Sequence, residues 1–168
     1  MQAFGQQWLL NAEYAEQTLQ TPVGKFDPEY HLIEAGIHFR AVTFILGYES
    51  LGSDDGLAGF ATPLATLHKF NGFTDQFLTT PAQGLHDWHA TLGGGIFSGK
   101  WSLGYHDFEA DDVAPLIDDF GKEYNAQYTQ PLGEHFSAGV KYANYEGGDL
   151  ATEKADTDKL WVWIGATF

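Results

Sequence analysis

The sequence has no cysteine, a single methionine and few basic residues: 8 lysines and arginines stand against 23 aspartates and glutamates. Without cysteine, the chain can have neither a disulfide framework nor a thiolate metal site. The formal net charge of -15 argues against a nucleic-acid partner, because phosphate binding requires a basic surface.

Long apolar runs are also missing. No run approaches the roughly 18 to 20 residues that a transmembrane helix requires, so a helical membrane protein is excluded. A transmembrane β-barrel is not excluded, because its strands need only about 9 to 11 residues of alternating polarity. The opening MQAFGQQWLL lacks the basic start and cleavage site of a secretory signal. We expect one domain over residues 1–168.

What the sequence does contain is apolar residues at every second position. Trp8, Leu10, Ala12 and Tyr14 begin the pattern, and it recurs along the chain without sustained helical spacing. Alternation of this kind predicts β-strands with one apolar face. Eight strands are expected, at residues 6–16, 30–40, 42–49, 86–97, 100–108, 120–130, 134–145 and 159–168.

The predicted connections alternate in length. Two-residue turns are expected at Arg40-Ala41 and Ser98-Gly99, and a three-residue turn at Pro131-Leu132-Gly133, because these lengths keep the apolar faces on one side. The long connections are expected at residues 17–29, 50–85, 109–119 and 146–158. We therefore predict an all-β fold: an eight-stranded antiparallel up-and-down transmembrane β-barrel with short periplasmic turns and long extracellular loops.

In that barrel the apolar face meets lipid, and the other face lines the lumen. Aromatic residues near the strand ends, with Ala, Val, Leu and Ile between them, are typical of an outward band with aromatic girdles. The predicted lumen residues are Glu13, Glu34, His38, Arg40, Glu49, Asp87, His89, Glu123 and Lys141. A soluble lipocalin-like ligand-binding barrel would alternate in the same way, with its apolar face turned inward.

The C-terminal strand has a further feature. It ends on Phe168 and carries apolar residues at every second position before it: Leu160, Val162, Ile164 and Ala166. This ending resembles the terminal signal by which the barrel-insertion machinery recognises bacterial outer-membrane proteins. In a closed barrel this strand would pair with the first strand and face lipid.

Residues 47–88 carry a second resemblance. The elements are GYE at 47–49, F-x-TPLATLHKFNG at 60–72, D-x-F at 75–77 and TP-x-x-GL at 80–85, and SLGYHDF at 102–108 adds to them. These stretches resemble outer-membrane porins of the alginate-export type from Gram-negative bacteria. The resemblance implies a transport barrel in the bacterial outer membrane, with the lipid bilayer, lipopolysaccharide and a small or polysaccharide solute as partners. Members of that family are larger barrels, so this chain resembles a C-terminal portion or a minimal relative. About eight strands leave a lumen filled by side chains.

Three other patterns bear on nucleotide binding, metal binding and proton transfer, and none of them is specific. Gly94, Gly99 and Lys100 match a phosphate-binding loop, but Trp101 stands where Ser or Thr should bind Mg²⁺. His86 and His89 point to opposite faces of a strand and cannot chelate together. Asp87 and His89 share the lumen face with His38, Glu34 and Glu49, and this set forms either a proton relay or a structural ion-pair network. Structural ion pairing is the favoured interpretation. We expect no cofactor, no metal site and no enzyme activity. A structural or adhesive barrel and a lipid-modifying barrel enzyme remain alternatives.

The connection at 50–85 is too long to serve only as a link. We expect its apolar residues to form a small cluster of their own over the barrel rim, with His68 and Lys69 as its polar contacts. These apolar residues are Phe60, Leu64, Leu67, Phe70, Phe73 and Phe77. The acidic residues of the other loops are interpreted as a solvated surface that resists aggregation.

Overall fold

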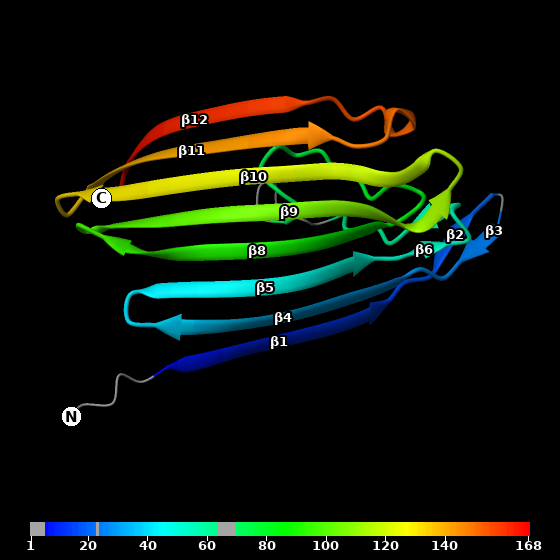
Figure 1. The fold of residues 1–168 in the computed structure, drawn as a ribbon, viewed down its shortest axis with the longest axis horizontal. Coiled ribbons are helices and arrows are strands. Elements are labelled where there is room, and N and C mark those ends of the chain that lie inside the picture. The colour runs from blue at the N-terminus through cyan, green and yellow to red at the C-terminus, as the bar shows by residue number, and fades with distance from the viewer. Residues whose placement is uncertain (1–5, 23, 64–69) are drawn as a thin grey trace.

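The computed structural model describes residues 6–22, 24–63 and 70–168, and its main feature is one eight-stranded antiparallel sheet (Figure 1). Each strand pairs with the next strand of the sheet along the chain, so the order is β1-β4-β5-β8-β9-β10-β11-β12. The bounds are β1 Gln7–Glu16, β4 Glu29–Phe39, β5 Val42–Leu51, β8 Leu85–Ile96, β9 Gly99–Ala114, β10 Ile117–Leu132, β11 Phe136–Gly147 and β12 Thr157–Ala166. The predicted antiparallel meander is confirmed. β1 and β12 are the two edges of the sheet, and its closure into a barrel stays a prediction.

Three tight turns join strands at one end of the sheet. Phe39 pairs with Val42, which confirms the turn at Arg40-Ala41. Ile96 pairs with Gly99, so the second turn is Phe97-Ser98, one residue earlier than predicted. The third turn is also displaced: it spans residues 133–135, although its odd length was predicted correctly. Arg40 and Phe97 adopt the left-handed conformation that two-residue hairpins require.

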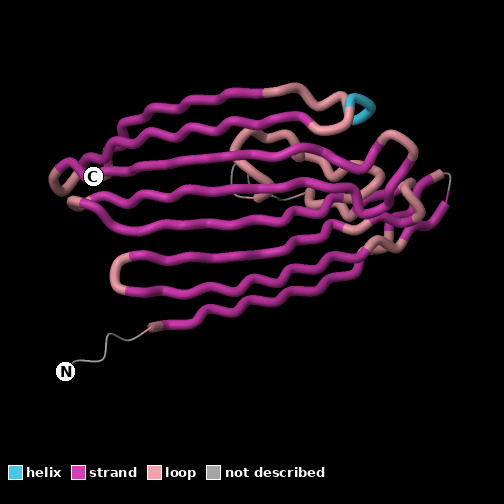
Figure 2. Tube along the Cα trace, in the orientation of Figure 1, coloured by secondary structure: helices cyan, strands magenta, loops and turns pink. Residues whose placement is uncertain are grey.

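The opposite end carries the longer connections (Figure 2). A small hairpin of β2 Leu19–Thr21 and β3 Gly24–Phe26 follows β1, and the short strands β6 Ser53–Asp54 and β7 Ala58–Gly59 follow β5. The single-turn 3-10 helix η1 Leu150–Thr152 lies between β11 and β12. The long loop predicted at 109–119 is wrong, because β9 and β10 continue as a hairpin until Ala114 pairs with Ile117.

The two faces of the sheet differ in what they bury. On the outer face, large apolar side chains from all eight strands are exposed: Trp8, Leu10, Tyr14, Ile33, Phe44, Leu46, Trp88, Leu92, Leu103, Tyr124, Val140, Tyr142, Leu160, Val162 and Ile164. On the inner face, a buried cluster forms near the long connections from Leu51, Phe77, Leu85, Phe108, Ala110, Phe120 and Tyr145. The alternation therefore continues through every strand, and the apolar set points away from the core.

The 52–84 connection covers part of the inner face instead of forming a separate cluster. Phe77 packs among the strands, with its ring 4.6 Å from that of Phe108, and Phe60 packs against the same cluster. Leu64 and Leu67 lie outside the described residues. The predicted independent cluster over the rim is thus wrong for Phe77, because the inner face offers it a larger apolar surface. Within the described residues, no helix is long and apolar enough to cross a membrane.

Candidate functional site

Five neighbouring strands contribute one residue each to a transverse row on the inner face. The backbone register places Glu34, Gly47, His89, His106 and Glu123 directly opposite one another on β4, β5, β8, β9 and β10. Gly47 leaves room for the His89 ring, because a Cβ there would lie 2.2 Å from Nε2 of His89. The imidazole can therefore lie across β5, where its Nε2 is 3.3 Å from Oε1 of Glu34.

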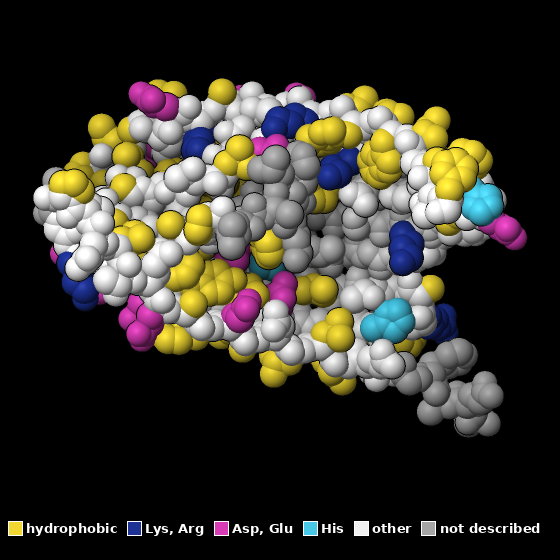
Figure 3. Space-filling model, turned by 180° about the vertical axis from the view of Figure 1, so that it is seen from behind, with side chains coloured by type: hydrophobic (Ala, Val, Ile, Leu, Met, Phe, Trp, Pro, Cys, Tyr) yellow, Lys and Arg dark blue, Asp and Glu magenta, His cyan; other side chains and the backbone are white. Residues whose placement is uncertain are grey.

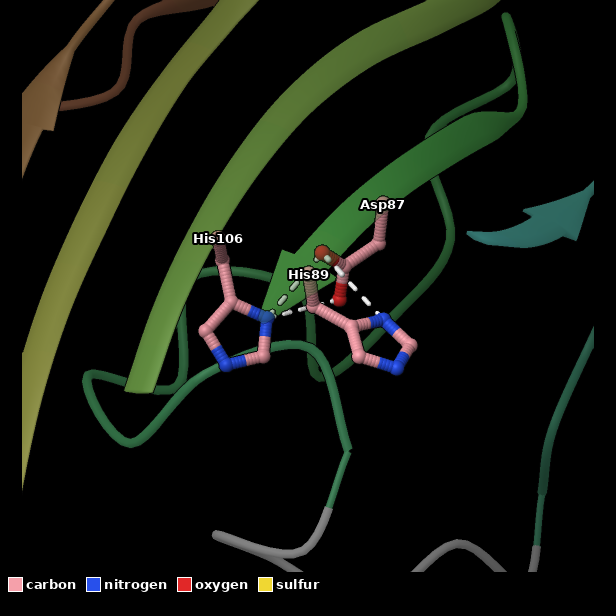
Figure 4. A group of neighbouring side chains, drawn as sticks. All are labelled: Asp87, His89 and His106. Carbon is pink, nitrogen blue, oxygen red and sulfur yellow. Dashed lines mark hydrogen bonds and ion pairs between the residues drawn. The ribbon is translucent and has the colours of Figure 1, made fainter. Parts of the chain in front are cut away.

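Asp87 joins this row from the next inward position of β8, two residues before His89. Nδ1 of His106 lies 2.9 Å and 3.0 Å from the two carboxylate oxygens of Asp87, and Nδ1 of His89 lies 3.9 Å from Oδ1. Figure 4 shows both imidazole rings turning Nδ1 toward the carboxylate. Asp87 is 1% exposed, so this cluster holds a buried acid between two histidines.

A second buried acid, Glu49, lies beside the cluster. Tyr30 donates its hydroxyl to Oε1 of Glu49 at 2.8 Å, and the Asn71 amide donates to Oε2 at 2.8 Å. The same Asn71 amide is 3.4 Å from Oδ2 of Asp87. Asn71 belongs to the 52–84 connection, so this segment lies directly against both acids and closes the cluster on that side.

Glu123 anchors the same segment. Its carboxylate accepts hydrogen bonds from the backbone N–H of Phe73 at 2.5 Å and of Thr74 at 3.0 Å, and from the Thr74 hydroxyl at 2.6 Å. Gly72 has a φ of +84°, and a Cβ there would lie 2.5 Å from Oε2 of Glu123. Hydrogen bonds to an ionised carboxylate are stronger than those between neutral groups. Glu123 therefore fixes the path of the connection across the sheet.

Lysines hold the segment from the side of β12. Lys159 donates to the Thr74 carbonyl and lies 3.1 Å from Oδ2 of Asp75. Lys141 on β11 lies over the rings of Phe73 and Trp161, at 4.4 Å and 5.3 Å from their centroids. The segment is therefore held by a carboxylate from β10 and by lysines from β11 and β12.

Lys154, in the loop before β12, reaches the same segment. It donates to the Gln76 carbonyl, and its amino group lies 4.8 Å from the centroid of the Phe77 ring. Burial beneath the segment lowers the pKa of the Lys154 amino group from its usual value.

The inner face is open toward the tight turns. A cavity of about 740 Å³ lies there, and Figure 3 shows a hollow at this end of the molecule. His38, whose Nδ1 is 2.8 Å from the Thr43 hydroxyl, lines it together with Lys100. Residues 93–95 are glycines, so β8 contributes backbone without side chains to the cavity wall.

The structure places most of the predicted lumen residues on the inner face, where they do not form one group. Asp87 and His89 lie together with Glu34 and Glu49; Glu123 and Lys141 hold the connection, and His38 lies at the cavity. Glu13 keeps the inward position of the edge strand β1, opposite Leu32, and is exposed at the open edge of the sheet. One placement differs from the prediction. Arg40 is exposed in the β4–β5 turn, with its guanidinium 5.1 Å from the centroid of the Phe39 ring, because a left-handed turn residue projects beyond the strands.

The predicted C-terminal insertion signal lies on the outer face and at the end of the chain. Leu160, Val162 and Ile164 are exposed on the outer face of β12, and Phe168 is fully exposed, but their role in barrel insertion stays a prediction. His68 and Lys69 lie outside the described residues.

The sequence interpretation missed His106 and Asn71. His106 falls at an inward position of β9, so its polarity on that face was the available signal. Asn71 gave no periodic signal, because the segment that carries it is irregular.

Comparison with known proteins yields no relative: the sequence matches no protein-family model, no curated protein and no solved structure. The resemblance to alginate-export porins therefore stays a prediction from the quoted motifs. Function has to be inferred from the geometry.

Proposed function

We propose that this chain forms the wall of a porin-like outer-membrane transport barrel whose lumen is narrowed by the 70–84 part of the connection. The observation that carries the proposal is the exposure of large apolar side chains along the outer face of every strand. Trp8 is 78% exposed, Leu10 82% and Ile164 77%. An apolar surface of that extent is typical of contact with a membrane or a partner.

Aromatic residues on the outer face support lipid as that contact. Tyr48 pairs with Trp88 near the end that carries the long connections, and Tyr105 pairs with Tyr124 closer to the middle of their strands, with ring centroids 4.5 Å and 5.1 Å apart. Trp101 lies four residues before Tyr105, toward the tight turns. Aromatic residues toward both strand ends of an outward face, such as Trp88 and Trp101, are typical of the girdles of outer-membrane barrels.

The inner face supports the same proposal. Buried acids, histidines and lysines lie there with the connection, as in a lumen that is polar and partly filled. A soluble lipocalin-like barrel would need the opposite arrangement, with the apolar set inside. In a bilayer the edges β1 and β12 need partner strands, because unpaired backbone groups are costly in lipid. The proposal therefore includes closure of the sheet, and β1 and β12 are antiparallel in an eight-strand meander.

Refolding the full chain into detergent micelles and lipid vesicles tests the proposal. We expect a β-rich species, by circular dichroism, that forms only with detergent or lipid and runs differently on electrophoresis before and after heating. Single-channel recording in planar bilayers then tests transport. A β-rich monomer that is stable in plain buffer would contradict the proposal.

A matched pair of substitutions on β9 tests which face meets lipid. Leu103 is exposed on the outer face, and Ser102 is the neighbouring inward residue. Leu103→Arg should lower the free energy of unfolding in vesicles by about 2–4 kcal/mol, because a charge is placed in the hydrocarbon layer. Ser102→Arg should cost clearly less. Equal effects, or a harmless Leu103→Arg, would argue against lipid at this face.

A further inference from the structure

We propose that Asp87, His89 and His106 form a binding site for one divalent transition-metal ion of the Zn²⁺ type. The three side chains bring two imidazole nitrogens and a carboxylate oxygen within 4.8 Å of one another. This donor set suits Zn²⁺ and its neighbours in the first transition row. The site goes beyond the proposed barrel, because it depends only on the inner faces of β8 and β9.

The register of the sheet builds the site without help from a flexible loop. His89 and His106 are direct cross-strand partners, and Asp87 lies two residues before His89 on the same face. Three donors on two paired strands are held at fixed spacing, which reduces the ordering that metal binding would otherwise require.

A buried ring nitrogen of His89 that lacks a hydrogen-bond partner within the described part of the chain points to a cation. The other ring nitrogen, Nε2, is 3.3 Å from Oε1 of Glu34, and because a carboxylate only accepts, the hydrogen is assigned to Nε2. In the neutral ring, Nδ1 then carries a lone pair. This atom is buried and has no hydrogen-bond partner among the described residues. A carboxylate behind a histidine is also the usual arrangement that orients a metal ligand.

The lone pair of His89 faces a second electron-rich atom. Nδ1 of His89 lies 3.9 Å from Oδ1 of Asp87, and this spacing leaves room for an ion between them. Metal–ligand distances of about 2.0–2.2 Å would place tetrahedral ligand atoms roughly 3.4 Å apart. Binding therefore requires the two imidazole rings to rotate until their Nδ1 atoms reach that spacing.

His106 completes the site by losing a hydrogen bond to Asp87. Its Nδ1 donates to the carboxylate at 2.9 Å, so metal binding at Nδ1 requires that hydrogen to leave. In a neutral ring the proton moves to Nε2, and in a protonated ring one proton is released to water. The ion also offsets buried negative charge, because Glu49 and Asp87 lie together and both accept from the neutral amide of Asn71.

Access is compatible with binding. Asp87 is buried, but the side chains of His89 and His106 keep 13% and 15% of their surface exposed. Three protein ligands leave a fourth position for water, as in metal sites that exchange ligands.

Titration of the detergent-refolded full chain with Zn²⁺ alone, followed by calorimetry, tests the proposal. We expect one Zn²⁺ per chain and a rise in the unfolding temperature with added Zn²⁺. His106→Ala should weaken binding more than about 100-fold. Glu34→Gln should weaken it about 10–100-fold, because the amide orients His89 less firmly.

His86→Ala is the matched control. His86 is next to Asp87 but contacts Asp111 at 2.7 Å and the Tyr48 ring, outside the cluster. This variant should bind Zn²⁺ as the unsubstituted chain does. Equal weakening in His86→Ala and His106→Ala, or no saturable binding, would overturn the proposal.

X-ray absorption at the zinc edge of the unsubstituted, Zn²⁺-loaded chain gives a test that needs no variant to fold. Two imidazole nitrogens are expected in the ligand shell, and a shell of oxygens alone would overturn the site. If the chain folds in plain buffer, the same titrations apply there. The metal site and the membrane proposal therefore fail separately.

Discussion

The two ends of the inner face differ in how far they are filled by side chains and by the long connection. Near the long connections, Phe77 packs against Phe108, Phe120 and Tyr145, and Glu123 binds the backbone of the connection. Near the tight turns, the same strands border a cavity of about 740 Å³. One end is closed by a segment of chain, and the other is hollow.

The inner face is filled where the connection docks on it, and it is hollow where the connection does not reach. The outer face is apolar toward both ends, as Trp8 and Tyr14 illustrate on β1. On the inner face, aromatic and acidic side chains lie where the segment docks, and the inward positions of β8 are glycines, Gly93 and Gly95, where it does not. On the proposed function, passage through the barrel is limited at the closed end.

Removing the main apolar anchor should have the largest effect on this comparison. Phe77 is 8% exposed within the closed end, so Phe77→Ala should lower the free energy of unfolding in detergent by about 3–5 kcal/mol. Urea unfolding followed by circular dichroism measures this loss. In planar bilayers, the loosened segment should raise single-channel conductance.

Phe97 provides the control from the open end. Its ring is 89% exposed in the β8–β9 turn, so Phe97→Ala should change the free energy of unfolding by less than about 1 kcal/mol. If Phe97→Ala lowered the free energy of unfolding as much as Phe77→Ala does, the closed end would contribute no more to the stability of the fold than the open end.

Most of the sheet could be predicted from the sequence, because two local signals agree. Alternation at every second residue sets the strand faces, and turn length has to preserve those faces between Phe39 and Val42. The extended β9–β10 hairpin was missed, because acidic residues such as Asp111 and Asp112 at its tip resemble a solvated loop. Acidic residues at this tip indicate that it is exposed to water, but an exposed segment can still form a strand.

The sequence predicted Asp87 and His89 as site residues but not their contact with His106. The reason is that the turn between β8 and β9 was predicted one residue too late. A turn at Ser98-Gly99 pairs Phe97 with Lys100 and sets His89 opposite Phe108. The actual turn, one residue earlier, sets His89 opposite His106. Glycine and serine are good turn residues, so the local sequence favours the wrong position, while Phe97 adopts a left-handed conformation that its residue type disfavours. Docking of Asn71 could not be predicted either, because it depends on contacts between distant segments.

Glycine substitutions at the two ends should give a smaller effect. A Cβ on Gly47 would lie 2.2 Å from His89, so Gly47→Ala should cost about 1–3 kcal/mol and displace the imidazole. A Cβ on Gly95 meets only a carbonyl oxygen at 3.8 Å, so Gly95→Ala should be neutral or stabilise by under about 1 kcal/mol. Urea midpoints of the two variants check this. Similar losses at both positions would mean that the open end is as tightly packed as the closed one.

The smallest effect is expected from Lys154, at the outer boundary of the closed end. Burial lowers the pKa of its amino group below the usual 10.5, so between the two values the unfolded chain binds more protons than the folded chain. Its contribution to the free energy of unfolding should therefore rise with pH in that window. Because this half-buried group keeps contact with water, the rise should stay under about 1 kcal/mol. Lys154→Met should abolish it, and comparing the urea midpoints of the two proteins between pH 8 and 11 removes the contribution of every other titrating group. If the urea midpoints of the two proteins changed with pH in the same way across that range, Lys154 would be in contact with water rather than buried. The filled part of the inner face would then end at Phe77.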